Sequence, residues 1–304
     1  MMEGGATGSR LSGTCVVYLA RINEGLAPVQ RFLRAYSSHD SGLPHRLIVL
    51  RRGFASNEEW SIYAEAFEEH HVRYDPMDVA DDGFDLGAYR EAARRSSADE
   101  FCFLNTFSEV LCDGWLANLH RAAHLERAGL VGATGSWESM YSSALPRRGA
   151  APVRLPRSAH IRDWFRVRAL HGDFAPFPNP HVRTNAFMLS RALALALDWG
   201  PLRRKTDAHR TESGRSGLSR QAAEAGLRNL VVGRDGTEYG SDEWPESATF
   251  RYRDQANLMV ADNRTRDYFA GSDAARRHLG HLAWGDRYQP SEAAPQEPAT
   301  EAGS

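Results

Sequence analysis

The sequence predicts an α/β fold in which a mostly parallel sheet is covered by helices on both faces. Short apolar runs, such as 15–20 and 101–104, alternate with longer segments whose apolar residues recur at helical spacing, such as 26–38. The short runs are apolar throughout, as expected for strands buried on both faces. This βαβαβ order favours a parallel sheet with right-handed crossovers.

The first half of the chain carries most of this pattern. Strands are expected at 15–20, 47–50, 72–74, 101–104 and 130–133, and helices at 26–38, from 57, at 86–95 and at 115–127. In the first helix, Val29, Phe32 and Leu33 share one face, and in the second, Trp60 and Phe67 do so. These faces are expected to cover the sheet.

The second half is less regular. Residues 137–180 are rich in Arg, Ser and Pro and carry little strand signal, which suggests an active-site loop region. An apolar run at 185–190 leads into a helical segment at 193–197. Further on, a helix is expected at 217–225, a last strand at 230–232 and a C-terminal helix at 264–279. One domain is expected over residues 14–288, with disordered tails at 1–13 and 289–304.

Composition excludes several classes of protein. The 304 residues are 42% apolar and carry a net charge of −2, which gives no case for bulk nucleic-acid binding. Three cysteines, Cys15, Cys102 and Cys112, have neither the number of a disulfide framework nor the spacing of a zinc site, so a reducing cytoplasm is the expected location. No apolar stretch approaches the length of a transmembrane helix.

Small polar residues directly follow the apolar run 101–104. Asn105, Thr106 and Ser108 come first and Glu109 follows, with a Gly-Trp-Leu helix start at 114–116. Groups placed there lie at the carboxyl edge of a parallel sheet, where α/β folds bind ligands. This block and the opening strand at 16–25 resemble family 2 glycosyltransferases of the GT-A (Rossmann-like) fold. The Asn-containing stretch, which replaces the usual Asp-x-Asp, matches the branch of rhamnan-synthesis proteins.

The resemblance implies a nucleoside-diphosphate sugar as donor and a glycan or lipid-linked acceptor, in polysaccharide biosynthesis. It suggests peripheral association with a polysaccharide-assembly complex. The implied donor-site residues come from the first strand, the segment 82–90 and the block after the fourth strand: Arg21, Glu24, Asp85, Arg90, Asn105, Thr106 and Ser108. Two of these residues have simpler structural interpretations. Glu24 is also an ordinary residue for a turn between a strand and a helix, and Asp85 is also favoured at the start of a helix by the helix dipole.

Because the Asp-x-Asp motif is missing, the sequence does not decide whether the site binds a metal ion. A divalent cation such as Mn²⁺ or Mg²⁺ prefers carboxylates, and only Glu109 offers one in this block. The charge of a departing diphosphate still needs neutralising. Basic residues offered for that role are His181, Arg183, Arg264 and Arg266. For each, a surface or structural role is the simpler interpretation.

A carboxylate is also needed to accept the proton of the acceptor hydroxyl. Glu212 is the first choice and Asp207 the second, from their place ahead of a helix; a purely helix-capping role is the alternative for Glu212. Trp137 and Trp244 lie in polar sequence and are candidates for stacking on a sugar, although most tryptophans are core residues.

The sequence therefore predicts a glycosyltransferase that acts by one direct displacement with inversion, the stereochemistry being implied by the resemblance. The alternative is a non-catalytic GT-A-like module that binds nucleotide or glycan and organises partner enzymes. Both predict that the end of strand 101–104 and the segment around Glu212 lie close together.

Overall fold

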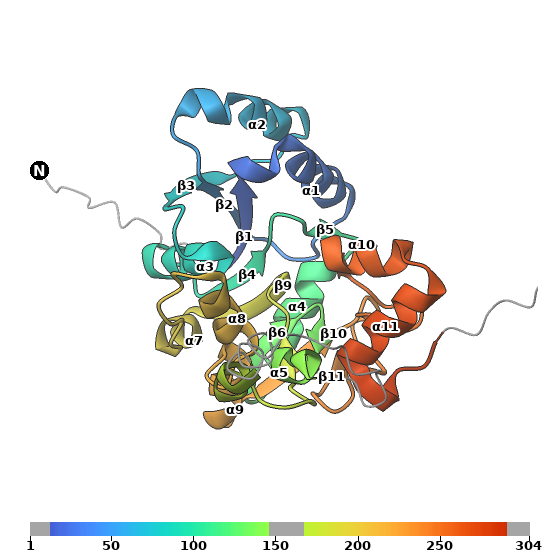
Figure 1. Cartoon of the computed structure of the whole chain (residues 1–304). Coiled ribbons are helices and arrows are strands. Elements are labelled where there is room, and N and C mark those ends of the chain that lie inside the picture. The colour runs from blue at the N-terminus through green and yellow to red at the C-terminus, as the bar shows by residue number, and fades with distance from the viewer. Residues whose placement is uncertain (1–12, 146–166, 291–304) are drawn as a thin grey trace, which may run out of the picture.

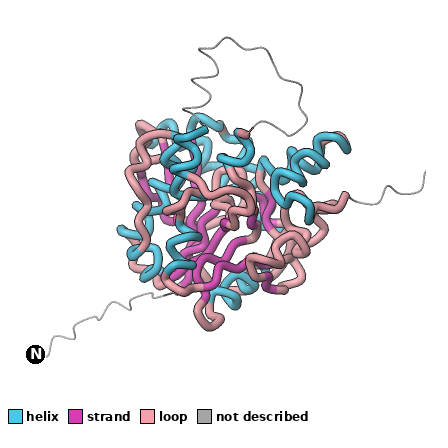
Figure 2. The backbone as a smooth tube through the Cα atoms, turned by 60° about the horizontal axis from the view of Figure 1, so that its bottom comes forward, coloured by secondary structure: helices cyan, strands magenta, loops and turns pink. Residues whose placement is uncertain are grey.

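The computed structural model describes residues 13–145 and 167–290. An eight-stranded central sheet has the order β11-β10-β6-β9-β4-β1-β2-β3. Its strands are β1 (Thr14–Arg21), β2 (Arg46–Arg52), β3 (Asp75–Val79), β4 (Glu100–Leu104), β6 (Ala128–Gly132), β9 (Ala186–Ser190), β10 (Arg228–Val232) and β11 (Glu238–Tyr239). Figure 2 shows these strands in the centre of the molecule, with helices around them.

Most neighbours in the sheet run parallel. β1 is parallel to β2 and β4, β2 to β3, and β6 to β10. β9 runs antiparallel between β4 and β6, and β11 is antiparallel to β10. Two small antiparallel sheets pair β5 (Glu109–Val110) with β12 (Val260–Ala261), and β7 (Gly135–Ser136) with β8 (His181–Val182). The predicted α/β class with a mostly parallel sheet is confirmed.

Helices cover both faces of this sheet (Figure 1). The α-helices are α1 (Leu26–Ser38), α2 (Asn57–Glu69), α3 (Phe84–Arg95), α4 (Trp115–Ala123), α5 (Met140–Ala144), α7 (Arg191–Ala196), α8 (Lys205–Ser213), α9 (Leu218–Glu224), α10 (Asn263–Ala270) and α11 (Asp273–Trp284). Residues 167–173 are also helical, and short 3-10 turns lie at Ile22–Glu24 and Gly285–Arg287.

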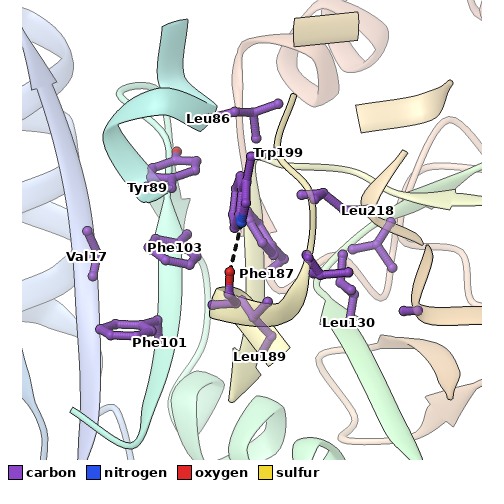
Figure 3. Packing of buried hydrophobic residues seen from close by; sticks show 14 of the residues in the cluster. Val17, Leu86, Tyr89, Phe101, Phe103, Leu130, Phe187, Leu189, Trp199 and Leu218 are labelled. Atoms are coloured by element: carbon purple, nitrogen blue, oxygen red, sulfur yellow. Dashed lines mark hydrogen bonds between the residues drawn. The ribbon is translucent and has the colours of Figure 1, made fainter. Parts of the chain in front are cut away.

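The two core layers follow from the alternation of side chains along the strands. Val17 and Phe103 point to the face covered by α3, where Tyr89 stacks on Phe103 with ring centroids 4.7 Å apart. Figure 3 shows Trp199 in this layer, with its indole N–H donating to the carbonyl of Ala194 at 2.8 Å. On the opposite face α1, α2 and α4 supply the buried side chains. Apolar strands buried on both sides thus explain the continuous apolar runs of the sequence.

Three element predictions are wrong in detail. The third strand lies at Asp75–Val79, not at 72–74. It is an edge strand whose exposed Asp75 and Asp78 pair with arginines of β2, so it lacks an apolar signature. The helix expected at 264–279 is two helices, because the chain turns at Gly271 and Ser272 caps α11. Helix α8 was not predicted, since its sequence is polar.

Some predictions lie outside the described residues. These are the tails at 1–13 and 289–304, apart from residues 13, 289 and 290, and positions 146–166 of the predicted loop region. Among the described residues, no helix combines the length and apolar character needed to cross a bilayer.

Candidate functional site

The candidate site lies at the carboxyl edge of the parallel strands. β1 ends at Arg21, β2 at Arg52 and β4 at Leu104, so the residues that follow these strands share one edge. β9 is antiparallel, and its first residue, Ala186, pairs with Leu104. The residues that precede β9 therefore reach the same edge as those that follow β4.

A cluster of opposite charges occupies the part of this edge at β1, β2 and α3. Arg21 contacts Glu24 at 3.2 Å and Asp85 at 3.8 Å. Arg52, nearly buried, contacts Asp85 at 3.4 Å and Asp81 at 2.9 Å. Burial raises the pKa of Asp85, although Arg21 and Arg52 pull it down. The structure thus brings together Arg21, Glu24 and Asp85, three of the predicted donor-site residues.

The turn after β4 is closed by its own polar groups. The carbonyl of the Asn105 side chain accepts from the backbone N–H of Phe107 at 2.9 Å and faces the Ser108 hydroxyl at 3.1 Å. Ser108 and Thr106 are buried, and the Thr106 hydroxyl has no hydrogen-bond partner among the described residues. Asn105 is partly exposed. Of the three predicted polar residues, Asn105 is therefore the one at the surface of the turn.

Glu212 of α8 is joined to this turn by two consecutive residues. Thr184 donates to Glu212 Oε1 from its backbone N–H at 3.0 Å and from its hydroxyl at 2.9 Å. The next carbonyl, that of Asn185, accepts from the Asn105 backbone N–H at 2.9 Å and from the Ser108 hydroxyl at 2.7 Å. The structure thus places the two predicted regions side by side.

The second carboxylate oxygen of Glu212, Oε2, has no hydrogen-bond partner among the described residues. The charge of Glu212 also contributes to raising the pKa of Asp85, so α8 and the charged cluster act on each other electrostatically. His209, one turn earlier on α8, has a pKa lowered by burial, and Glu212 opposes this shift. Glu212 is therefore a partly buried carboxylate with one oxygen available.

Asp207 has a different role. It is buried and accepts from the backbone N–H groups of Arg203 and Arg204 and from the Arg210 guanidinium at 2.9 Å. Burial acts to raise its pKa, but the Arg204 N–H and the neighbouring arginines lower it overall. Its hydrogen bonds hold the first turn of α8, so it does not fit the role of a second-choice base.

Glu109 lies between two guanidinium groups. Arg266 contacts its Oε2 at 3.0 Å, and Arg31 contacts the same atom at 3.8 Å. A divalent cation would have to displace both arginines, and the Asn105 side-chain oxygen is already used within its turn. This donor set does not fit a divalent metal at the end of β4.

The remaining predicted arginines differ in whether their guanidinium groups are already paired. Arg183, which is partly buried, pairs with the buried Asp262 at 2.7 Å and lies over the Phe250 ring at 4.1 Å. Arg264 is exposed in the first turn of α10 and has no hydrogen bond or ion pair among the described residues. Its charge contributes to lowering the pKa of His209, so it acts across to α8. Of these arginines, Arg264 is the one with a free guanidinium.

The predicted aromatic residues and His181 lie deeper. Trp137 and Trp244 are buried, and their indole N–H groups donate to the carbonyls of Ser241 and Tyr239. Both indoles pack in the core, although their neighbours in the sequence are polar, so neither offers an exposed ring face for stacking on a sugar. His181 is also buried, but it borders with Glu212 and Trp244 a cavity of about 160 Å³. Arg90 donates to the carbonyl of Gly200 at 3.1 Å, away from the charged cluster.

Four residues of this edge were not predicted: Arg52, Asp81, Thr184 and Asp262. Arg52 has a usable signal, since it stands at the last position of a strand in the same way as Arg21. Thr184 and Asp262 have none, because their roles depend on the antiparallel insertion of β9 and on the packing of α10.

Comparisons with known proteins give structural matches alone. No family model matches the chain, and no curated protein matches it by sequence. The mannosyltransferase PcManGT from Pyrobaculum calidifontis, solved with GDP-Man and Mn²⁺, is 14% identical with a TM-score of 0.46, covering 72% of this chain and 54% of that one. TarS of S. aureus is 10% identical with a TM-score of 0.38, covering 64% and 32%. The glycosyltransferase GlyE of Streptococcus pneumoniae is 12% identical with a TM-score of 0.33, covering 61% and 36%.

The chain thus spans about half or less of the length of these solved structures. With identities this low and TM-scores below 0.5, the matches do not by themselves argue for a shared activity.

Proposed function

We propose that this chain is a glycosyltransferase that moves a sugar from a nucleoside-diphosphate sugar to a glycan or lipid-linked acceptor. The observation that carries the proposal is the convergence at the carboxyl edge. The Thr184–Asn185 pair binds both the carboxylate of Glu212 and the turn at Asn105. A possible base and a polar turn at a sheet edge that suits ligands are thereby held together.

The nucleotide would bind at the charged cluster. Asp85 and Glu24 offer acceptors for the hydroxyls of a ribose or the N–H groups of a base, and Arg21 holds both carboxylates in place. The donor sugar would lie over the turn at Asn105, with Ser108 supporting the turn from below.

Charge neutralisation of the leaving diphosphate would come from arginine. Arg264 is free and stands in the first turn of α10 with its side chain exposed, so its guanidinium can reach an anionic ligand. Arg266, two residues further along the same helix, would contribute once an anionic ligand competes with Glu109. Because the donor set at the end of β4 does not fit a divalent metal, no step in this mechanism passes through one.

The reaction would be a single displacement. The acceptor hydroxyl oxygen forms a bond to the anomeric carbon, the bond from that carbon to the diphosphate oxygen breaks, and the proton moves to Glu212 Oε2. Thr184 keeps the other carboxylate oxygen in place, which fixes the direction of Oε2. Inversion of the anomeric carbon follows from attack opposite to the leaving group.

The test is transfer activity of Glu212→Gln, measured with UDP, GDP and dTDP sugars against a panel of acceptors. Loss of a general base is expected to lower kcat by about 100-fold or more, while calorimetry shows unchanged affinity for the nucleotide. Glu224→Gln is the matched control, since Glu224 is an exposed glutamate on the neighbouring α9. Transfer by Glu212→Gln at the wild-type rate would exclude Glu212 as the base.

The second candidate is a non-catalytic module that binds nucleotide or glycan for partner enzymes. It is favoured by Glu109, which is held by Arg31 and Arg266 where a metal-dependent enzyme would keep its carboxylates free. Saturable nucleotide binding without turnover on any acceptor would support this candidate over the enzyme.

A further inference from the structure

Two imidazoles and one carboxylate meet at the edge of the sheet opposite to the candidate site. Glu100 begins β4, His120 lies in the last turn of α4, and His124 follows directly after that helix. His120 Nδ1 lies 2.6 Å from Glu100 Oε1, and His124 Nε2 lies 3.8 Å from Glu100 Oε2. One ligand atom from each residue fits within 4.8 Å of the others. Histidines four residues apart at a helix end present their rings on one side.

Glu100 differs from the other buried carboxylates. Asp207 and Asp262 are the remaining buried acidic side chains among the described residues, and each is paired with an arginine. Glu100 lies against two histidines instead, in a chain where 37 residues are Lys or Arg. A buried carboxylate without a permanent cation is costly unless another positive group compensates its charge.

The surrounding hydrogen bonds orient these groups in the way that metal sites do. His124 Nδ1 donates to the carbonyl of His120 at 2.9 Å, so the proton of that ring is on Nδ1 and the Nε2 lone pair is directed toward Glu100. The Thr14 hydroxyl of β1 donates to Glu100 Oε1 and fixes the carboxylate. Hydrogen bonds of this kind, to the second ring nitrogen and to the carboxylate, hold metal ligands in their binding orientation.

We propose that Glu100, His120 and His124 bind a zinc ion. Two imidazole nitrogens and one carboxylate oxygen are a typical zinc donor set, whereas Mg²⁺ and Ca²⁺ prefer sites made of oxygen atoms. His120 Nδ1 and Glu100 Oε1 share a hydrogen bond, so zinc would replace its proton and these two atoms would move apart, while His124 would move closer, to reach bonds of about 2.0–2.2 Å. His124 can supply this movement, because its side chain is 59% exposed. A water molecule would complete the tetrahedron.

This ion would lie apart from the proposed transfer site. β4 runs from Glu100 to Leu104, so the site lies roughly 17 Å along the chain from Asn105, the first residue of the turn after β4. The ion would join the start of β4 to the end of α4, and through Thr14 to the start of β1. It is therefore separate from any cation that accompanies a diphosphate, and the inference holds whether or not the proposed transferase activity does.

The test uses the full chain, treated with EDTA and then dialysed. Calorimetry with Zn²⁺ is expected to show one saturable equivalent, and Co²⁺ is expected to give the visible absorption bands of a tetrahedral site. Zn²⁺ should also raise the Tm. His124→Asn is the main variant, because His124 is largely exposed and its loss should leave the fold intact. It should weaken Zn²⁺ binding at least about tenfold and abolish the Zn²⁺-dependent rise in Tm.

His71→Asn is the matched control. His71 is exposed and has a φ of 53°, which asparagine tolerates, so this variant should bind Zn²⁺ as the wild type does. Glu100→Gln should also lose the one equivalent of bound Zn²⁺, provided that its far-ultraviolet circular dichroism matches that of the wild type. The proposal is overturned by the absence of a one-equivalent site, or by equal Zn²⁺ affinity of His124→Asn and His71→Asn, which would mean adventitious surface binding.

Discussion

Asp262→Asn tests whether the buried ion pair beside the site stabilises the protein. Asp262 is 1% exposed and contacts Arg183 at 2.7 Å, and its side chain also caps α10 by accepting from the Thr265 backbone N–H at 2.8 Å. Asparagine is an equally good N-cap residue, so the substitution keeps the cap and removes the charge. The consequence is that the Arg183 guanidinium, whose side chain is only 12% exposed, has a neutral partner.

The expected loss of stability follows from the burial of Asp262. Breaking a buried ion pair costs about 3–5 kcal/mol, and the amide oxygen that remains can still accept one hydrogen bond, so we expect a loss of about 2–4 kcal/mol. The matched control is Asp75→Asn. Asp75 also contacts an arginine, Arg46, at 2.7 Å, but its side chain is 56% exposed. Exposed pairs contribute about 0–1 kcal/mol, so burial is the main difference between the two variants.

The measurement is urea unfolding of both variants and the wild type, followed by circular dichroism. With a slope of about 3 kcal/mol per molar urea, Asp262→Asn should lower the midpoint by about 1 M and Asp75→Asn by about 0.3 M or less. Equal shifts of the urea midpoint for the two variants would refute this reasoning. The distance between the charged groups, and not their burial, would then determine the loss of stability.

The pH dependence gives a second check on the same pair. Burial acts to raise the pKa of Asp262, but Arg183 and the hydrogen bonds from Thr265 lower it overall. A carboxyl whose pKa is lower in the folded state stabilises the protein above its unfolded pKa, about 3.9. That contribution is lost as the pH falls through the folded pKa. The stability difference between wild type and Asp262→Asn should therefore be constant near neutral pH and shrink below about pH 4.

Three further predictions concern the site. Asp207→Asn should lower the free energy of unfolding in urea by about 1–3 kcal/mol, because it leaves buried hydrogen-bonding groups weakly paired. The proposed transfer rate of the folded protein should stay unchanged, and a complete loss of that rate would restore Asp207 as a candidate base. Arg21→Gln should weaken nucleotide binding, measured by calorimetry, by about tenfold, because it removes charge-assisted hydrogen bonds at the charged cluster. The control Arg46→Gln should leave nucleotide affinity unchanged, and equal effects of the two variants would place the nucleotide elsewhere. The rate of sugar transfer in EDTA should match the rate in Mn²⁺, because arginines hold Glu109. A strict requirement for Mn²⁺ would contradict this expectation.

Much of the fold could be predicted because buried strands and amphipathic helices follow from local apolar patterns. Helix α1 has the predicted bounds, and β1, β2 and β4 differ from the predictions by at most two residues at either end. β3 was misplaced, since an edge strand with aspartates paired to arginines has no apolar run. Helix α8 was missed because it is stabilised by the capping of Asp207 and not by an apolar face.

The candidate site was predictable only where its residues directly follow strands. Arg21 and Asn105 could be placed at one edge from the order of strands and helices, because parallel strands carry their carboxyl ends to the same side. The burial of Trp137 and Trp244 could not be predicted. Their neighbours in the sequence are polar, but the elements that cover them come from distant parts of the chain.

The direction of β9 is what connects the two halves of the proposed site. A parallel strand in this position would bring the residues that precede it to the amino edge, far from the turn at Asn105. Because β9 is antiparallel to β4, Asn185 arrives beside Asn105, and Thr184 is left to hold Glu212. Spacing along the sequence cannot reveal this, since Thr184 and Asn105 are separated by 79 residues and an apolar run has the same composition in either direction. The strand that breaks the parallel pattern is therefore the element on which the proposed chemistry depends.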